Sequence, residues 1–156
     1  MQSKWKTYGL WILLAEAVGA LSGWLTREGM EVYKEELTKP PLSPPGIVFP
    51  IVWAILFALM GIGAARVWLA RPSRERRTAL WAFGLQLGFN FFWSIFFFNL
   101  QWFGFALLWL AVLWLLILWM TLLFRKVEPA GWWLQIPYLL WVAFAAYLNF
   151  GVWRLN

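Results

Sequence analysis

The 156-residue chain contains no cysteine, no histidine and no aspartate. Without cysteine it can form neither a disulfide nor a thiolate nucleophile or metal ligand. Without histidine and aspartate, imidazole metal sites, histidine ligands to haem, Ser-His-Asp triads and aspartyl phosphoryl transfer are excluded. These absences remove most routes to polar catalysis, and no metal site is expected.

Charge is also scarce, since 13% of the residues are charged and 63% are apolar. The apolar residues form five runs without strand-like alternation, at 8-25, 47-70, 78-98, 102-124 and 132-153. A helix rises ~1.5 Å per residue and needs roughly 20 residues to cross a hydrocarbon core of about 30 Å. The runs therefore predict an all-α membrane protein, a bundle of five transmembrane helices in a single membrane domain over residues 1-156.

The basic residues are distributed unevenly between the two ends of such a bundle. If the helices alternate direction, eight Lys and Arg lie on the side of the N-terminus and four lie on the other side, with Arg66 inside the second run. This excess predicts a cytoplasmic N-terminus. Together with the lack of a transit peptide it favours a prokaryotic cytoplasmic membrane. It also accounts for the net charge of +6 without nucleic acid as a partner, with membrane lipid as the expected contact.

The long outer loop between helices 1 and 2, residues 26-46, is the only long connection. Long loops in compact domains often act as lids or binding loops. Its four prolines stiffen the approach to the second helix, and residues 28-37 can form a short amphipathic helix. We expect a lid over an outward-facing cavity, although a solvated spacer is an equal alternative. The candidate lid residues are Tyr33, Pro40, Pro44 and Pro45.

The third run has two different faces at 100° per residue. Gly84 and Gly88 lie on one side, and Gln86, Asn90 and Trp93 lie on the other. The glycine side is a small-xxx-small surface that predicts the face of a homodimer, and the amide side is expected to face an internal cavity. Alternatively, both faces pack inside one bundle. A similar series of small residues in the first run leaves the choice of dimer helix open.

Few polar or aromatic residues lie deep in the runs. Glu16 is the only carboxylate there, and we expect it to be structural or to line a cavity rather than to catalyse. Tryptophans near the ends of runs are expected to anchor at the membrane interface. Deeper ones such as Trp53, Trp93 and Trp141 would suit a flat, largely apolar ligand.

Three motifs occur in order along the chain. They are KPPLSPPG at 39-46 followed by FPIVW at 49-53, then Gln86-Leu87 with Asn90, Trp93 and the phenylalanines 96-98, and finally IPYLLW at 136-141 with Ala145 and Leu148-Asn149. Together they resemble the tryptophan-rich sensory protein/translocator protein family, also called peripheral benzodiazepine receptors. The resemblance implies a five-helix membrane protein, usually a homodimer. Its outer loop would close over a pocket for porphyrins, sterols and synthetic benzodiazepine-type ligands.

The resemblance also implies which residues line that pocket. They are Trp53, Asn90, Trp93, Trp141, Ala145 and Leu148. The leading interpretation is a membrane receptor or sensor that needs no cofactor and binds protoporphyrin, a haem-like tetrapyrrole or another small apolar ligand. One alternative is an enzyme that breaks down porphyrins in light with Trp53 and Trp141 as electron donors. Another is a porphyrin or sterol transporter, which five helices without an inverted repeat disfavour.

Overall fold

The computed structural model describes residues 2-156, which form seven α-helices and one π-helical segment and contain no strand. The elements are α1 (Gln2–Leu25), α2 (Arg27–Glu35), α3 (Val48–Trp68), α4 (Arg74–Ser94), the π-helical η1 (Ile95–Asn99), α5 (Phe103–Val127), α6 (Pro129–Trp133) and α7 (Ile136–Leu155). Five segments of the described chain are long and apolar enough to cross a membrane, namely α1, α3, α4 with η1, α5, and α6 with α7. The chain is thus an integral membrane protein with the predicted all-α fold.

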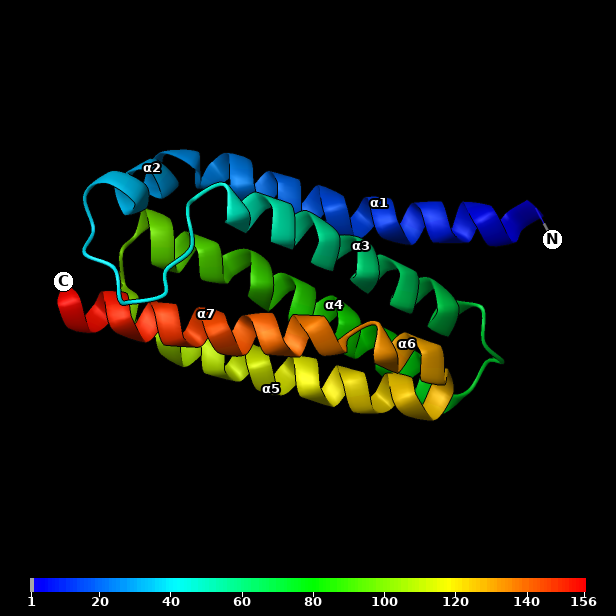
Figure 1. Ribbon diagram of the computed structural model, residues 1–156. Coiled ribbons are helices and arrows are strands. Elements are labelled where there is room, and N and C mark those ends of the chain that lie inside the picture. The colour runs from blue at the N-terminus through cyan, green and yellow to red at the C-terminus, as the bar shows by residue number, and fades with distance from the viewer. Residues whose placement is uncertain (1) are drawn as a thin grey trace.

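The five spans run side by side along one direction (Figure 1). Helix α1 packs along α3, α4 packs along α5, and α5 packs along α7. The loop of residues 26-46 and the C-terminal end of α7 lie at one end of the bundle, called here the lid end. The N-terminal end of α1, the α3–α4 loop and α6 lie at the other, called here the basic end.

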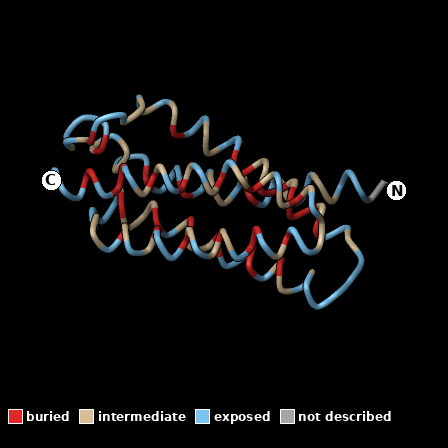
Figure 2. Tube along the Cα trace, turned by 60° about the horizontal axis from the view of Figure 1, so that its bottom comes forward, coloured by how far each residue is buried: buried red, intermediate tan, exposed pale blue. Residues whose placement is uncertain are grey.

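Buried residues follow the inward side of the spans, and exposed residues cover the outside (Figure 2). The inside combines small residues such as Ala64 and Ala82 with large ones such as Phe83, Leu113 and Phe124. On the outside, many large apolar side chains are exposed. In a membrane these side chains contact lipid, so their exposure involves no loss of hydrophobic stabilisation.

Several helix boundaries differ from those expected from the apolar runs, and the largest shift is in α1, which begins at Gln2 rather than at residue 8. Helix α4 begins at Arg74 rather than at residue 78, because Ser73 caps it by accepting a hydrogen bond from the Arg76 N–H at 3.0 Å. The last span is divided at Leu134 and Gln135 into α6 and α7. Each of these helices has a proline in its first turn, where the missing N–H has no helical partner to lose.

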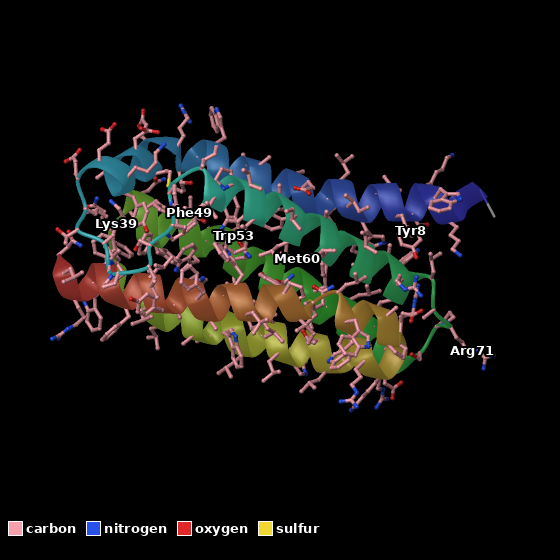
Figure 3. All side chains as sticks on the ribbon, viewed as in Figure 1. Tyr8, Lys39, Phe49, Trp53, Met60 and Arg71 are labelled. Atoms are coloured by element: carbon pink, nitrogen blue, oxygen red, sulfur yellow. The ribbon has the colours of Figure 1, made fainter. Side chains whose placement is uncertain are left out.

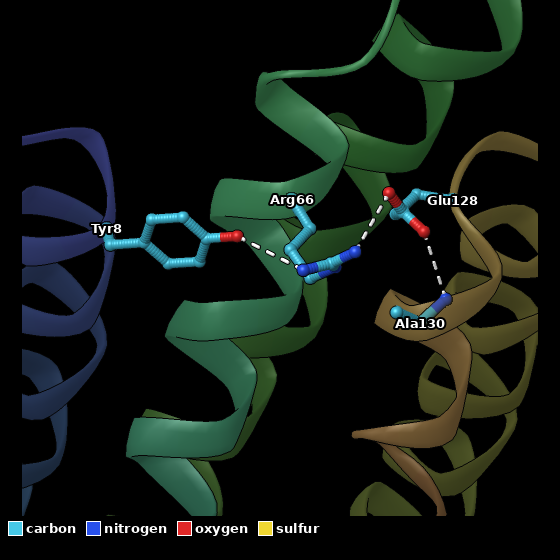
Figure 4. A network of polar contacts seen from close by, with 4 residues as sticks. All are labelled: Tyr8, Arg66, Glu128 and Ala130. Carbon is cyan, nitrogen blue, oxygen red and sulfur yellow. Dashed lines mark hydrogen bonds and ion pairs between the residues drawn. The ribbon is translucent and has the colours of Figure 1, made fainter. Parts of the chain in front are cut away.

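Arg66, the single basic residue inside a predicted run, joins three elements at the basic end (Figure 4). Its guanidinium donates to the Tyr8 hydroxyl of α1 at 3.3 Å and forms an ion pair with Glu128 at 3.4 Å. Glu128 in turn caps α6 by accepting from the Ala130 N–H at 3.1 Å. The charge that is costly to place in a membrane is therefore paired.

The loop of residues 26-46 is ordered by its own contacts. Its first part forms α2, close to the short helix expected at 28-37. The Lys39 ammonium donates to the carbonyls of Tyr33, Lys34 and Leu37 at 3.0 to 3.1 Å and so satisfies carbonyl groups at the end of α2. Leu42 follows with a φ of 72°, which turns the chain back toward α3.

The same loop is attached to the bundle on two sides. On one side, Gly29 lies directly against the Phe98 carbonyl of η1. On the other, the Asn156 amide exchanges two hydrogen bonds with the Thr38 backbone at 2.7 and 3.0 Å. The Tyr147 hydroxyl donates to the Pro41 carbonyl at 2.7 Å. These contacts hold the loop across the end of the bundle as a structured cover.

Candidate ligand-binding site

A cavity of about 530 Å³ lies beneath this loop and is lined by α1, α2, α3, α4, η1 and α7. Its volume is within the range of small-molecule pockets in proteins. All six residues predicted to line a pocket do line this cavity: Trp53, Asn90, Trp93, Trp141, Ala145 and Leu148. That these residues contact a ligand is still a prediction.

The predicted lid residues separate into two groups. Tyr33 lines the cavity and is 3% exposed. Pro40, Pro44 and Pro45 do not line it, and Pro40 instead packs against Gly151 near the end of α7. The prolines therefore shape and attach the loop, whereas the aromatic ring of α2 covers the space below.

Aromatic rings form much of the cavity wall. The Trp53 and Trp141 rings meet edge to face, with centroids 6.5 Å apart and planes at 87°. Phe49 lies against Trp141 at 6.0 Å and against Tyr33 at 5.9 Å, so the wall continues into the cover. Figure 3 shows Phe49 and Trp53 on the part of α3 next to the loop. Such a wall offers ring faces and edges to a flat apolar ligand.

A chain of buried polar groups lies beside the cavity. The Asn90 amide donates to the Tyr138 hydroxyl at 2.6 Å, and this hydroxyl donates to the Gln86 carbonyl oxygen at 2.7 Å. The Gln86 amide donates to the Phe83 carbonyl at 3.1 Å. The chain holds the Asn90 side chain in one orientation at the cavity wall. Sequence reasoning missed Tyr138, although its position within the third motif was the available signal.

The indole N–H groups of two cavity tryptophans differ in what they can offer. Trp93 donates its N–H to Asn149 at 3.0 Å, and Asn149 donates to the Phe103 carbonyl at 2.8 Å, so Trp93 presents only its ring. The Trp141 N–H is buried and has no hydrogen-bond partner within residues 2-156. A buried donor left unpaired is costly, so a ligand acceptor that reached this N–H would be stabilised.

The cavity reaches the molecular surface between α1 and the first half of α3. Ala20 and Gly23 of α1 and Pro50 and Ala54 of α3 line the cavity and are exposed. All four lie within helices that can cross a membrane. The opening therefore faces the bilayer laterally, and small side chains keep it wide.

Charged groups of α2 also line the cavity. Arg27 and Lys34 are exposed members of its lining, and Lys34 forms an ion pair with Glu31 at 2.7 Å. Glu16 also lines the cavity, which agrees with one of the two roles expected for it, structural or cavity-lining.

Burial raises the pKa of the Tyr33 phenol above its usual value, and the nearby Ser43 hydroxyl partly offsets the shift. Tyr33 thus stays neutral across the physiological range.

The two faces expected on the third span are separated in the structure. Gln86, Asn90 and Trp93 point inward and are at most 7% exposed. Gly84 and Gly88 face outward, with no other atom within 4 Å of the position that a Cβ would occupy. Their surface is free for another helix, and homodimerisation through it is still a prediction.

Within residues 2-156 there is no cluster of three carboxylates that could hold a metal ion.

Comparison with known proteins gives the family. The sequence pattern of the TspO/MBR family matches residues 11-154. The chain is 36% identical over 154 residues to the tryptophan-rich protein TspO of Chlorobaculum tepidum, covering 96% of both chains. It is 32% identical over 147 residues to the translocator protein of Bos taurus, covering 92% of this chain and 86% of that one. Because the match spans nearly the whole sequence, the chain belongs to the TspO/MBR family of integral membrane proteins.

Proposed function

We propose that the protein is a membrane receptor that binds a flat amphiphilic ligand of the porphyrin class in the cavity under the loop of residues 26-46. The observation that carries this proposal is the aromatic cavity, two of whose lining residues, Tyr33 and Trp141, hold a buried polar group without a hydrogen-bond partner in the described chain. The names of the relatives, translocator protein and tryptophan-rich protein, are compatible with ligand handling but do not specify a ligand.

The chemistry of the lining supports a ligand that is apolar over its face and acidic at its edge. The rings of Phe49, Trp53 and Trp141 present aromatic surface to a planar macrocycle. Arg27 and Lys34, exposed residues of the lining, place positive charge where the carboxylates of such a ligand would be close to water. Protoporphyrin combines both features, so it is the probe of choice.

The position of the opening supports uptake from the bilayer. The ligand would enter between α1 and α3 from the leaflet at the lid end and then lie beneath Tyr33. The ligand-bound state would be signalled by a change in the loop or in a dimer. With the N-terminus in the cytoplasm of a prokaryote, as the excess of basic residues favours, the ligand would come from the outer leaflet.

Filling the cavity tests the proposal. In Ala145→Phe the new ring occupies cavity space, and we expect the dissociation constant for protoporphyrin in the dark to rise at least tenfold. Tryptophan fluorescence quenching of the purified protein in detergent measures it. Ala143→Phe is the matched control, because Ala143 is on the same helix but is exposed and does not line the cavity. Equal affinity in both variants would reject this cavity as the binding site.

A second candidate function is favoured by the contact between Trp53 and Trp141. Two indoles with centroids 6.5 Å apart can share an oxidising equivalent. A porphyrin excited by light would take an electron from an indole and pass it to dissolved dioxygen, and the indole radical cation would then regain an electron from the porphyrin, so that the net change is oxidation of the pigment by dioxygen. The result would be pigment breakdown, and the protein would then be a photo-oxidative enzyme.

Light-dependent pigment loss separates the two functions. If the protein is an enzyme, illuminated samples should lose more than one equivalent of protoporphyrin, and Trp53→Phe or Trp141→Phe should abolish this loss while dark binding changes little. Pigment loss of the same extent in these variants would show that breakdown is a side reaction of the bound photosensitiser.

A further inference from the structure

An open groove lies at the basic end of the bundle, far from the cavity. It is formed where α3 ends and α4 begins, and it is lined by Trp68, Arg74, Arg76, Arg77 and Trp81 among others. Figure 3 shows Arg71 of the same loop at the end opposite Phe49 and Trp53. The groove is thus separate from the site described above.

The charge of the groove is strongly positive. Residues 71-77 include four arginines and a single acidic residue, Glu75. Arg76 is held in place, because its Nε and Nη2 donate to the Trp68 carbonyl at 3.1 and 2.8 Å and its guanidinium lies 4.6 Å from the centroid of the Trp68 ring. The exposed side chains of Arg74 and Arg77 form no ion pair or hydrogen bond with any residue of the described chain. Two guanidinium groups are therefore available to an anion.

The groove changes from charged to aromatic along the membrane normal. Arg74, Arg77 and Trp81 are spaced i, i+3 and i+7, so they lie on one face of α4. At ~1.5 Å per residue, Trp81 lies roughly 6 Å deeper in the bilayer than Arg77. Trp68 and Trp81 are 47% and 74% exposed, and both are at the edges of spans. Indole rings at this depth prefer the glycerol and upper acyl region of a membrane.

We propose that this groove is a binding site for the headgroup of an anionic glycerophospholipid in the leaflet at the basic end. Arg74 and Arg77 contact the phosphate, because a planar guanidinium matches two phosphate oxygens. Trp68 and Trp81 contact the glycerol and the first part of the acyl chains. Arg76 is a positioning residue, since it fixes the Trp68 side of the groove. A free phosphate ion would use the arginines but would leave both exposed indoles without a function.

Native mass spectrometry of the full chain in detergent tests the site. The probes are phosphatidylglycerol and phosphatidylcholine with the same acyl chains. We expect the first phosphatidylglycerol to bind the unmodified chain at least tenfold more tightly than phosphatidylcholine. The double variant R74Q/R77Q should bind phosphatidylglycerol roughly thirtyfold more weakly, since each basic residue at a membrane surface contributes a factor of about five. R74K/R77K keeps the charge but loses the paired donors, so its affinity for phosphatidylglycerol should lie between those of the unmodified chain and R74Q/R77Q.

The matched control is R125Q/K126Q, which removes two charges from the same end of the bundle but outside the groove. Its affinity for phosphatidylglycerol should change less than threefold, and both glutamine pairs should have the same thermal unfolding midpoint. An equal loss in the control pair, or equal binding of the two lipids, would overturn the site. Displacement of the lipid by submillimolar inorganic phosphate would overturn the lipid assignment in favour of a free anion.

Discussion

Tyr138 shows how a single residue connects the cavity with the interior of the bundle. It is 1% exposed, its hydroxyl lies between the side chains of Asn90 and Gln86, and its ring packs edge to face against Trp53 at 6.2 Å. The Tyr138 hydroxyl is the hydrogen-bond partner of both the Asn90 amide and the Gln86 carbonyl oxygen. The geometry of Asn90 at the cavity wall therefore depends on a hydroxyl that does not itself line the cavity.

Removal of the Tyr138 hydroxyl should lower the stability of the protein. In Tyr138→Phe, the Asn90 amide and the Gln86 oxygen each lose a buried partner, and the expected cost is about 1–3 kcal/mol per unsatisfied group. The thermal unfolding midpoint in detergent, followed by circular dichroism, should fall clearly. Tyr147→Phe is the control, because its hydroxyl bonds only to the exposed Pro41 carbonyl of the loop. Equal midpoints in the two variants would contradict a structural role of the buried chain.

At the scale of elements, the loop of residues 26-46 depends on close backbone approach. Gly29 of α2 lies so near the Phe98 carbonyl that a Cβ at this position would clash with backbone atoms. Because backbone cannot move aside as a flexible side chain can, any larger residue must lift α2 from η1. Glycine is thus required there for contact rather than for a special φ angle.

Gly29→Ala should loosen the cover. Amide hydrogen exchange in residues 27-46 is expected to accelerate, and protoporphyrin should dissociate several times faster. By helix propensity alone, alanine would be favoured by about 0.5–1 kcal/mol, so faster exchange would show that the clash dominates. Gly9→Ala is the control, because the space around Gly9 is open. Unchanged exchange in Gly29→Ala would show that α2 is not held by this contact.

The lateral opening is also a property of two elements. Ala20→Trp would place an indole at the exposed border of the cavity, and we expect slower association and dissociation of protoporphyrin by similar factors, with little change in equilibrium affinity. Stopped-flow quenching measures both rates. Ala17→Trp is the control, since Ala17 is exposed on α1 but does not line the cavity. Unaltered rates in Ala20→Trp would mean that the ligand takes another route, such as displacement of the loop.

The sequence was sufficient to locate the membrane-spanning helices but not to predict which side chains of different helices contact one another. Length and apolarity located five membrane helices, and angular position separated Gln86 and Asn90 from the glycines of the same helix. The charged first turn of α4 lies outside any apolar run, so its start at Arg74 depends on the Ser73 cap. The pairing of Asn90 with Tyr138, 48 residues later, depends on how helices pack, and no periodicity within one helix contains that information.

For the whole molecule, the two candidate dimer faces differ in how much open space surrounds their small residues. On α1, Ala15 is fully buried and a Cβ on Gly19 would meet the Phe57 ring, so only Gly23 of this series faces open space. On α4, Gly84 and Gly88 face open space, which favours them as the surface where a second copy approaches. In a two-fold dimer through this surface, the same glycines of both copies would meet.

Gly84→Leu/Gly88→Leu tests this choice. Two leucines would hold the backbones of facing helices apart, and we expect the protein to shift from dimer to monomer in sedimentation velocity experiments in detergent. Because both side chains would enter open space within one bundle, the thermal unfolding of the monomer should not change. Gly9→Leu is the control on α1, where the surroundings are also open. A dimer that persists in the α4 variant but is lost in Gly9→Leu would move the interface to α1, and a dimer that persists in both would exclude either glycine surface as its contact.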